Sequence, residues 1–487
     1  MTFTRRSFLT GAVLAGGSLW AASSLWRPSF AAEARQLRIP ELIDARDQGQ
    51  SIALTAQVGK ISFFPGRESV TLGYNSNYLG PTLRVHRGDE VEMAVTNALR
   101  EDTTVHWHGL LIPGELDGGP HQTIRPGSTW RPVLPIRQPA ATLWYHSHAH
   151  GHTGEQVYAG LAGLLIVSDD DERALGLPSE YGVDDLPLIL QDRQFESGTL
   201  VLPQGMMSAM HGRRGDTLMV NGTVNPVARV PRGLVRLRLV NGSNAREYDL
   251  AFADDRPFHW IASEGGLLEK PAELRSLRLA PGERAEILAD FSDGRPATLE
   301  TGPDGNLSMM MGMMRGQANL LGGNRREAVI QFEPQGKAVL GSNVPERLLA
   351  HERLDVSKAV RRRRFVMNMG MGNMMRGGMG MLSINGRAFD MGRVDEQIRL
   401  GDTEIWEVSG EMMAHPFHIH GVHFEVLSRN GSAPGIRDQG LRDTVVAQEP
   451  VELLVKFTQT AVASPFMYHC HILEHEDNGM MGQFVVS

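Results

Sequence analysis

Histidines in pairs separated by one residue are the main chemical feature of this 487-residue sequence. On an extended strand, residues i and i+2 point to the same face, so each pair can direct two imidazoles at one place. Imidazole is a ligand for Cu, Zn, Fe and Ni. Two pairs lie near the start of the chain and two near its end, which predicts a metal centre shared by two distant segments. The pairs are His106/His108, His146/His148, His418/His420 and His469/His471.

The single cysteine narrows the choice of metal. Cys470 stands between His469 and His471, so its side chain must point to the opposite face of the strand. Two imidazoles, one thiolate and a weak axial thioether form the blue-copper electron-transfer set. A lone buried cysteine is usually inert core, but the flanking ligands favour a metal site here. The residues that complete this set are His415, His475 and Met480.

Strand patterns dominate the segments that must position these ligands. Residues 91–95, 235–239 and 403–408 alternate apolar and polar side chains, and a glycine precedes each segment. The 54 glycines and 26 prolines favour turns between short strands. The domain-sized intervals between the three segments indicate a repeat. The sequence therefore predicts an all-β protein of three tandem β-sandwich domains with antiparallel sheets.

Composition excludes several classes of protein. The formal net charge of −8 argues against nucleic acid as a partner. A single cysteine excludes an intrachain disulfide framework. After the first thirty residues, no segment is long and apolar enough to cross a bilayer.

The N-terminus has the pattern of an export signal. Arg5 and Arg6 precede a moderately apolar run over 11–26, and small residues follow at 31–34. This pattern resembles a twin-arginine signal, and the run is too short and too interrupted by glycine for a membrane span. We expect residues 1–32 to be this signal, the twin-arginine machinery to be a partner, and the mature protein to be periplasmic. The predicted domains are then 33–170 (first domain), 171–345 (middle domain) and 360–487 (third domain).

The ligand motifs together resemble those of the multicopper oxidases. The matching segments are His106-Trp107-His108-Gly109, His146-Ser147-His148, His415-Pro416-Phe417-His418-Ile419-His420 and His469 to Met480. The resemblance implies three cupredoxin-like Greek-key domains and four copper ions. It also implies that the middle domain supplies no ligand.

The resemblance assigns each ligand to a copper. It implies that His106 and His418 hold the type 2 copper. The type 1 set would be His415, Cys470, His475 and Met480. The type 3 pair would be held by His108, His146, His148, His420, His469 and His471. No ligand of this set is missing, which argues against a role like that of the copper-free relatives, which act in cell division or as scaffolds. His150 and His152 could offer a shifted pair of ligands, but the family pattern uses His146 and His148.

Two carboxylates match acidic positions of the family. The resemblance implies that Asp117 lies near the type 2 copper and that Glu476 relays protons. The alternative is that both only hydrogen-bond turns or orient ligand imidazoles.

Methionines indicate a substrate. Twelve of the 24 lie in the windows 309–314 and 367–381, and thioethers are soft ligands that favour Cu(I). Glycines interrupt the second window, so a loop is expected there rather than a helix. This resembles the cuprous oxidases, although the window is short and Glu411 stands where aspartate is expected. The candidate Cu(I) ligands are Met367, Met369, Met371, Glu411 and Met413; for 309–314, core packing is an equal alternative.

These features lead to one main hypothesis and two alternatives. The main hypothesis is a monomeric oxidase that couples oxidation of Cu(I) to reduction of dioxygen to water in copper homeostasis. The first alternative is a laccase-like oxidase of phenols and aromatic amines, which are small reducing organic substrates. The second is a copper-sequestering protein without turnover.

Overall fold

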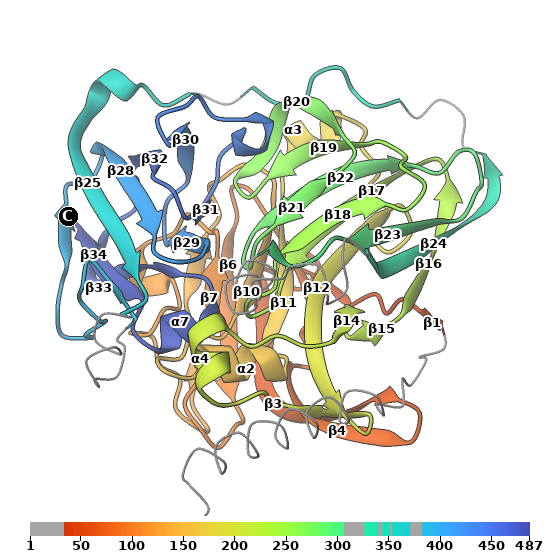
Figure 1. Cartoon of the computed structure of the whole chain (residues 1–487), viewed down its shortest axis with the longest axis horizontal. Coiled ribbons are helices and arrows are strands. Elements are labelled where there is room, and N and C mark those ends of the chain that lie inside the picture. Colours follow the sequence, from red (N-terminus) through yellow and green to blue (C-terminus); the bar gives the residue numbers. More distant parts are fainter. Residues whose placement is uncertain (1–33, 306–325, 339–342, 351–352, 371–381) are drawn as a thin grey trace, which may run out of the picture. The chain divides into compact units, whose positions relative to one another are not determined.

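The computed structural model describes residues 34–305, 326–338, 343–350, 353–370 and 382–487 (Figure 1). The predicted signal, the methionine window 309–314 and Met371 lie outside these ranges. Within them, no helix has the length and apolarity that a bilayer crossing requires.

The described chain forms six sheets, two in each predicted domain. The prediction of an all-β fold with three cupredoxin-like sandwiches is confirmed. In the first domain one sheet has the strand order β2-β5-β11-β10-β7 and the other β4-β3-β6-β8, with β9 beside β6. Their bounds are β2 Leu42–Asp44, β3 Ser51–Phe64, β4 Arg67–Tyr74, β5 Thr82–His86, β6 Glu90–Asn97, β7 His106–His108, β8 Thr129–Trp130, β9 Val133–Pro135, β10 Ala141–His146 and β11 Ala162–Ser168.

The middle domain has the largest sheet, in the order β15-β14-β12-β17-β22-β19-β20 with β13 beside β12. Its second sheet has the order β1-β16-β24-β23-β18-β21, so β1 (Arg35–Gln36) pairs with β16 of the middle domain although its residues fall within the predicted first domain. The other bounds are β12 Asp185–Glu196, β13 Thr199–Val201, β14 Thr217–Val220, β15 Thr223–Val224, β16 Pro226–Arg232, β17 Leu234–Asn241, β18 Tyr248–Phe252, β19 Phe258–Ser263, β20 Gly266–Leu274, β21 Leu277–Leu279, β22 Arg284–Asp290, β23 Ala297–Thr301 and β24 Glu327–Ala338.

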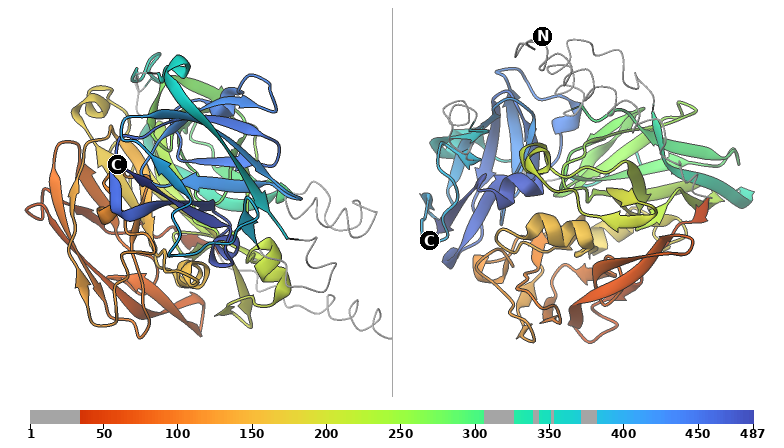
Figure 2. Two further views of the ribbon diagram at one scale, coloured as in Figure 1. Left: turned by 90° about the vertical axis from the view of Figure 1, so that its left-hand side faces the viewer. Right: turned by 60° about the horizontal axis from the view of Figure 1, so that its bottom comes forward.

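The third domain has two sheets of five strands, in the orders β26-β25-β28-β32-β30 and β27-β34-β33-β29-β31. The bounds are β25 Ala359–Asn368, β26 Ser383–Ile384, β27 Glu396–Ile398, β28 Thr403–Gly410, β29 His415–Ile419, β30 Phe424–Arg429, β31 Thr444–Ala447, β32 Val451–Lys456, β33 Ala461–Cys470 and β34 Met481–Val486. Figure 2 shows these strands, coloured from cyan to dark blue, from two further sides.

The three alternating segments predicted from sequence occupy equivalent strands. Each lies in β6, β17 or β28, and each of these pairs in parallel with an earlier strand, namely β3, β12 or β25. The expectation of purely antiparallel sheets is therefore wrong. Between the two paired strands the chain crosses to the opposite sheet, where it forms β5, β16 or β27. It therefore enters the second strand of the pair in the same direction as the first. The domain boundaries themselves stay a prediction.

Each sandwich has its own hydrophobic core. One core comprises residues between 45 and 167, one comprises Leu37 with residues between 177 and 348, and one comprises Ala245 with residues between 365 and 486. Burial of apolar side chains between facing sheets is the main term that stabilises such sandwiches. The three cores support the domain-sized repeat inferred from the strand pattern.

Short helices lie between the sheets. The α-helices are α2 Thr153–Ala159, α3 Asp170–Ala174, α4 Met206–His211 and α7 Leu473–Asp477, and the 3₁₀ turns are η1 Gly114–Leu116, η2 Val356–Lys358 and η3 Ile436–Asp438. Helix α7, which immediately follows the Cys470 strand, contacts both α2 and α4 (Figures 1 and 2). All three predicted domains thus contribute a helix to this contact.

Candidate metal centres

Two pairs of adjacent strands carry the paired histidines. In the first domain β7 and β10 are antiparallel, and His106 lies opposite His146. In the third domain β29 and β33 are antiparallel, and His418 lies opposite His469. Only His106 and His108 both lie within a strand, whereas His148, His420 and His471 lie one or two residues beyond the ends of β10, β29 and β33. The two rings of every pair still lie near one another, with centroids 4.9 to 6.1 Å apart.

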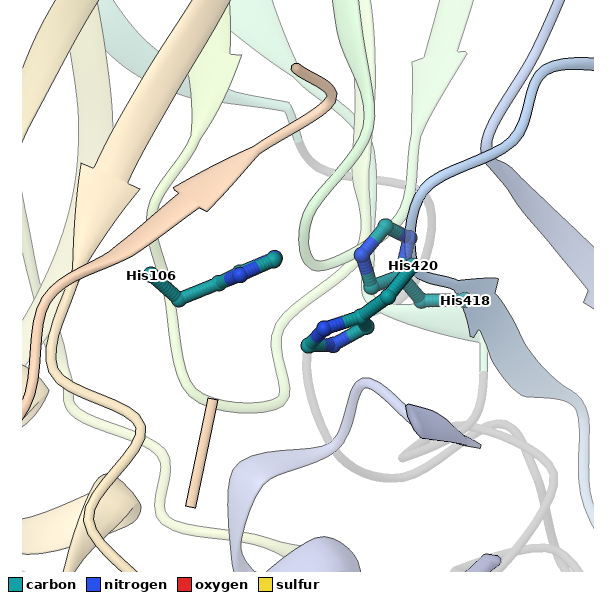
Figure 3. A group of neighbouring side chains, drawn as sticks. All are labelled: His106, His418 and His420. Atoms are coloured by element: carbon teal, nitrogen blue, oxygen red, sulfur yellow. The ribbon is translucent and has the colours of Figure 1, made fainter. Parts of the chain in front are cut away.

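The histidines of the first and third domains converge at one buried site. The rings of His106 and His420 stack with centroids 3.8 Å apart, and those of His108 and His418 stack at 3.7 Å. Figure 3 shows His106 reaching from the first domain toward His418 and His420. His469 Nε2 lies 3.3 Å from His148 Nε2 and 3.2 Å from His420 Nε2. The convergence that the four pairs predict is therefore present, and all eight rings are buried.

Outer hydrogen bonds fix the orientation of several rings. Nδ1–H of His106 donates to the carbonyl oxygen of Asp117 at 3.0 Å, that of His146 to Ser147 at 2.8 Å, and that of His418 to Asp443 at 2.9 Å. In all three rings Nε2 has no hydrogen-bond partner among the described residues. The same holds for Nδ1 of His108 and for both ring nitrogens of His471.

The ring nitrogens without hydrogen-bond partners show whether this buried site fits a metal ion. A buried polar atom without a partner is costly, so a set of convergent ones indicates ligands. Burial and neighbouring imidazoles lower the pKa of six of the cluster histidines, which favours neutral rings that can ligate; these are His108, His146, His148, His420, His469 and His471. Three histidine triads have ligand atoms within 4.8 Å of one another: His106/His418/His420, His106/His108/His146 and His148/His420/His469. The residues fit a copper cluster; which copper each holds stays a prediction.

The predicted type 1 residues form a second buried group. Cys470 Sγ lies 3.5 Å from His415 Nδ1 and 3.6 Å from His475 Nδ1, and these two nitrogens are 3.3 Å apart. Met480 is also buried, and its carbonyl oxygen accepts the Cys470 N–H at 3.1 Å. One thiol and two imidazole nitrogens at these separations fit a blue-copper site, with the Met480 thioether as the candidate axial ligand.

The outward nitrogens of the two type 1 imidazoles bind backbone carbonyls. His415 Nε2–H donates to Glu411 O at 3.2 Å, and His475 Nε2–H donates to Met210 O at 3.0 Å. Burial lowers the pKa of His415 to about 4. Burial also raises the pKa of the Cys470 thiol well above its usual range. Without a metal, this site therefore holds neutral imidazoles and a protonated thiol.

The two predicted acidic residues both contact cluster imidazoles. Asp117 Oδ2 accepts from His420 Nδ1–H at 2.7 Å and lies 3.4 Å from His106 Nδ1. Glu476 places Oε1 3.2 Å from His148 Nδ1 and Oε2 3.2 Å from His469 Nδ1. Burial, followed by the nearby Asp477 carboxylate, raises the pKa of Glu476 well above its usual range. The contacts agree both with proton transfer and with the alternative role of orienting imidazoles.

Two further residues at the cluster, Asp443 and Arg284, are not predicted from the sequence. The Asp443 carboxylate accepts from His108 Nε2 at 3.1 Å and from two nitrogens of Arg284 at 2.7 and 2.5 Å. Both residues are fully buried, and Arg284 belongs to the middle domain. Burial opposes ionisation of Asp443, but Arg284 and His108 outweigh it and hold the pKa of the carboxyl well below its usual range. The middle domain therefore supports the cluster although it supplies no predicted copper ligand.

Three of the predicted substrate methionines are buried, and the fourth, Met371, lies outside the described residues. Met367, Met369 and Met413 are buried in the core of the third domain, the core that also contains Cys470 and Met480. Glu411 is exposed. The structure thus places these three methionines in the hydrophobic core of the third domain rather than on an exposed surface. His150 and His152, the alternative register, are exposed and lie in none of the ligand groups found among the described residues.

Comparisons with known proteins agree with this geometry. The sequence profile described as "Multicopper oxidase" matches residues 55–172, and a second profile with the same description matches 360–487. Multicopper oxidase mco of Staphylococcus aureus is 38% identical over 93% of this chain and 92% of its own. Cell division protein FtsP of Xenorhabdus nematophila is 38% identical over 100% of this chain and 99% of its own.

A solved structure extends the match to the fold. The laccase-like multicopper oxidase CueO of Ochrobactrum sp. has a TM-score of 0.85 and 41% identity, over 93% of this chain and 100% of that one. Sequence profile, full-length relatives and fold therefore agree with the buried histidine groups. The chain belongs to the multicopper oxidase family.

Proposed function

We propose that this protein is a periplasmic copper-dependent oxidase that takes electrons singly from Cu(I) and transfers them to dioxygen, forming water. The observation that carries the proposal is the position of Cys470 on β33. Its sulfur faces His415 and His475, while His469 and His471 on either side of it face the cluster. A site for single electrons is thus one residue away from a multinuclear site.

Residues of the protein connect the type 1 site to the histidine cluster. When bound, the coppers supply a one-electron acceptor and a multinuclear centre for dioxygen reduction. Cys470 is joined to His469 and to His471 by one peptide unit each, so the protein offers two short covalent paths between the sites. His469 Nδ1–H donates to Cys470 O at 3.0 Å, which holds that ring in place. Complete burial excludes bulk water from both groups.

Protons are the other requirement of water formation. Glu476 contacts two cluster imidazoles, and burial raises the pKa of its carboxyl well above its usual range, which favours the protonated form. A buried acid in that state can donate a proton and be recharged. Asp117 Oδ2 accepts from His420 and lies beside His106, so it holds these rings and can accept a proton in turn.

Cu(I) is the proposed substrate because methionines share the core of the third domain with the type 1 residues. Met367, Met369 and Met413 pack in the same core as Cys470, and the exposed Glu411 accepts the outward N–H of His415 on its carbonyl oxygen. Thioethers favour Cu(I) over harder cations. Oxidation to Cu(II) weakens this preference and favours release of the product.

The comparisons support two other candidates. The Ochrobactrum sp. protein is described as laccase-like, with oxidase activity towards lignin model compounds and lignosulfonate, which favours phenolic substrates. The FtsP relatives are named for cell division, which favours a structural role. A purely structural role leaves unexplained why the described part of the chain buries convergent imidazole nitrogens without partners.

Oxygen uptake by the copper-loaded protein tests the proposal. Cu(I) and a simple methoxyphenol are supplied separately, with and without added copper, to the wild type and to a Met367→Leu/Met413→Leu variant. The expected result is uptake with Cu(I) that falls in the variant. Met93→Leu, a buried methionine of the first domain, is the matched control and should leave uptake unchanged.

Each alternative predicts a different result. Phenol oxidation that is fast without added copper and unaffected by the two substitutions would favour the laccase-like enzyme. Copper-loaded protein that consumes no oxygen with either substrate would favour sequestration or a structural role. Export is tested separately by replacing Arg5 and Arg6 with lysine and measuring the mature protein in the periplasmic fraction, which should fall sharply.

A further inference from the structure

Helix α4 is a methionine-rich segment of the middle domain beside the predicted type 1 site. Its six residues read Met206-Met207-Ser208-Ala209-Met210-His211, and glycines with positive φ stand on both sides of it (Gly205, +100°; Gly212, +77°). Among the described residues, Met206 is the most exposed large apolar side chain at 69%, and Met207 is 53% exposed. Exposed methionine pairs need an explanation because methionine is usually buried.

The spacing brings the soft ligands of α4 together. Met206 and Met210 are four residues apart, Met207 and Met210 three, and Met207 and His211 four, so each pair occupies neighbouring positions on the helix surface. Burial, followed by the Arg214 guanidinium, lowers the pKa of His211, so this imidazole is neutral at neutral pH. Three thioethers and one imidazole form a donor set suited to Cu(I).

The helix is held against the type 1 loop. Met210 packs against the core of the third domain, and its carbonyl oxygen accepts His475 Nε2–H at 3.0 Å. Arg213 donates to both carboxylate oxygens of Glu474 on α7, at 2.8 Å from its backbone and 3.0 Å from its side chain. A Cβ added at Gly212 would lie 2.7 Å from Ile472, so the end of the helix is in close contact with the ligand loop.

We propose that α4 is a Cu(I)-binding site, with Met206, Met207, Met210 and His211 as its ligands, that delivers the substrate to the edge of His475. This inference rests on the proposed function and adds a binding site outside the predicted Met367/Met413 group. Each bound Cu(I) is oxidised to Cu(II) and gives one electron inward through the His475–Met210 hydrogen bond. Four such events, with four protons, reduce one dioxygen to two waters. The harder Cu(II) then leaves the thioethers.

Silver(I) binding tests the site without turnover, because Ag(I) is a soft cation that the enzyme cannot oxidise. Copper-loaded wild type and a Met206→Leu/Met207→Leu/Met210→Leu variant are titrated with Ag(I) by calorimetry and native mass spectrometry. Leucine keeps the approximate volume but removes the sulfur. The expected result is loss of one Ag(I) equivalent, or affinity weakened about tenfold or more. Met391→Leu, an exposed methionine outside α4, is the control and should bind like wild type.

The possible outcomes separate this inference from the proposed function. Unchanged Ag(I) stoichiometry and affinity in the triple variant would overturn the α4 site, even if the wild type oxidises Cu(I). A wild type that oxidises no Cu(I) would overturn the proposed function, while selective Ag(I) loss in the variant would still support the site. The blue absorption of the variant shows whether the type 1 group is intact. Where it is, a KM for Cu(I) that rises about tenfold or more supports delivery through α4, and an unchanged KM contradicts delivery.

Discussion

Arg284 donates two hydrogen bonds to the carboxylate of Asp443, at 2.7 and 2.5 Å, across the boundary between the middle and third domains. Asp443 also accepts from His108 of the first domain at 3.1 Å. One buried carboxylate thus joins all three domains at the histidine cluster. Bidentate arginine–carboxylate pairs are strong and geometrically specific, so we expect Arg284 to position His108 with its Nδ1 toward the cluster.

Removing the guanidinium should therefore affect both stability and the cluster. In Arg284→Gln a buried carboxylate loses its partner, and the free energy of unfolding should fall by about 3–5 kcal/mol. Denaturant unfolding of the metal-free protein measures this loss. In the loaded protein, the near-ultraviolet absorption of the type 3 pair should weaken while the blue absorption persists. Arg275→Gln, at an exposed ion pair with Asp255, should change neither property. An Arg284 variant that matches this control would contradict the positioning role.

Replacing Cys470 by serine should abolish the intense blue absorption and the oxidase activity. The hydroxyl is a much poorer copper ligand than the thiolate, while the backbone that holds His469 and His471 is unchanged. Optical spectra and metal analysis should show loss of type 1 copper with retention of the cluster. Met480→Leu is the comparison, since loss of an axial ligand should shift the reduction potential but keep the colour. A blue, active Cys470→Ser protein would refute the type 1 assignment.

Glu476→Gln should slow the reaction with dioxygen. Glutamine keeps the shape of the side chain but cannot transfer a proton, and loss of a general acid typically costs about 10²–10⁴ in rate. Stopped-flow reoxidation of the reduced protein measures this step, and anaerobic reduction of the type 1 site should be unchanged. Glu474→Gln on the same helix is the control, because Glu474 binds Arg213 and Asn244 rather than an imidazole. If both variants reoxidise equally fast, Glu476 is only an orienting residue.

Copper uptake at the type 1 site should depend on pH. Burial raises the pKa of the Cys470 thiol, so binding must release its proton, whereas the His415 pKa of about 4 leaves that imidazole already neutral. Because the thiol pKa lies above the solution pH, apparent affinity should rise about tenfold per pH unit through the neutral range. Development of the blue absorption at buffered copper concentrations measures this slope. A flat profile between pH 6 and 8 would show that the thiol is already ionised.

The copper ligands could be predicted from the sequence because strand geometry is local. On an extended strand a histidine two residues from another shares its face, and Cys470 opposes its neighbours. The rings of the pairs lie together in the structure although His148, His420 and His471 lie just beyond their strands. Asp443 and Arg284 could not be found in this way. They are 159 positions apart in the chain, Arg284 begins β22 while Asp443 lies just before β31, and no regular spacing marks either residue. Only the packing of the domains brings them together.

The exposure of the methionines also could not be predicted from the sequence. Composition marked the window 367–381, but Met367 and Met369 face the core, whereas the exposed pair on α4 lies in a short helix of the middle domain. Whether a thioether faces solvent or core depends on tertiary contacts, since methionine suits both environments. Strand direction was missed for a related reason: the alternation of side chains does not reveal which neighbour a strand will choose.

The division of the histidine cluster between two distant segments affects when the protein can bind and retain metal. Residues 106–148 and 418–471 hold complementary halves, and neither half alone presents the triads that combine His106 or His148 with residues of the third domain. Metal held by these shared triads would therefore show that both segments are present and folded together. A proteolytic cut that let the segments part would open both shared triads and release the metal that they hold.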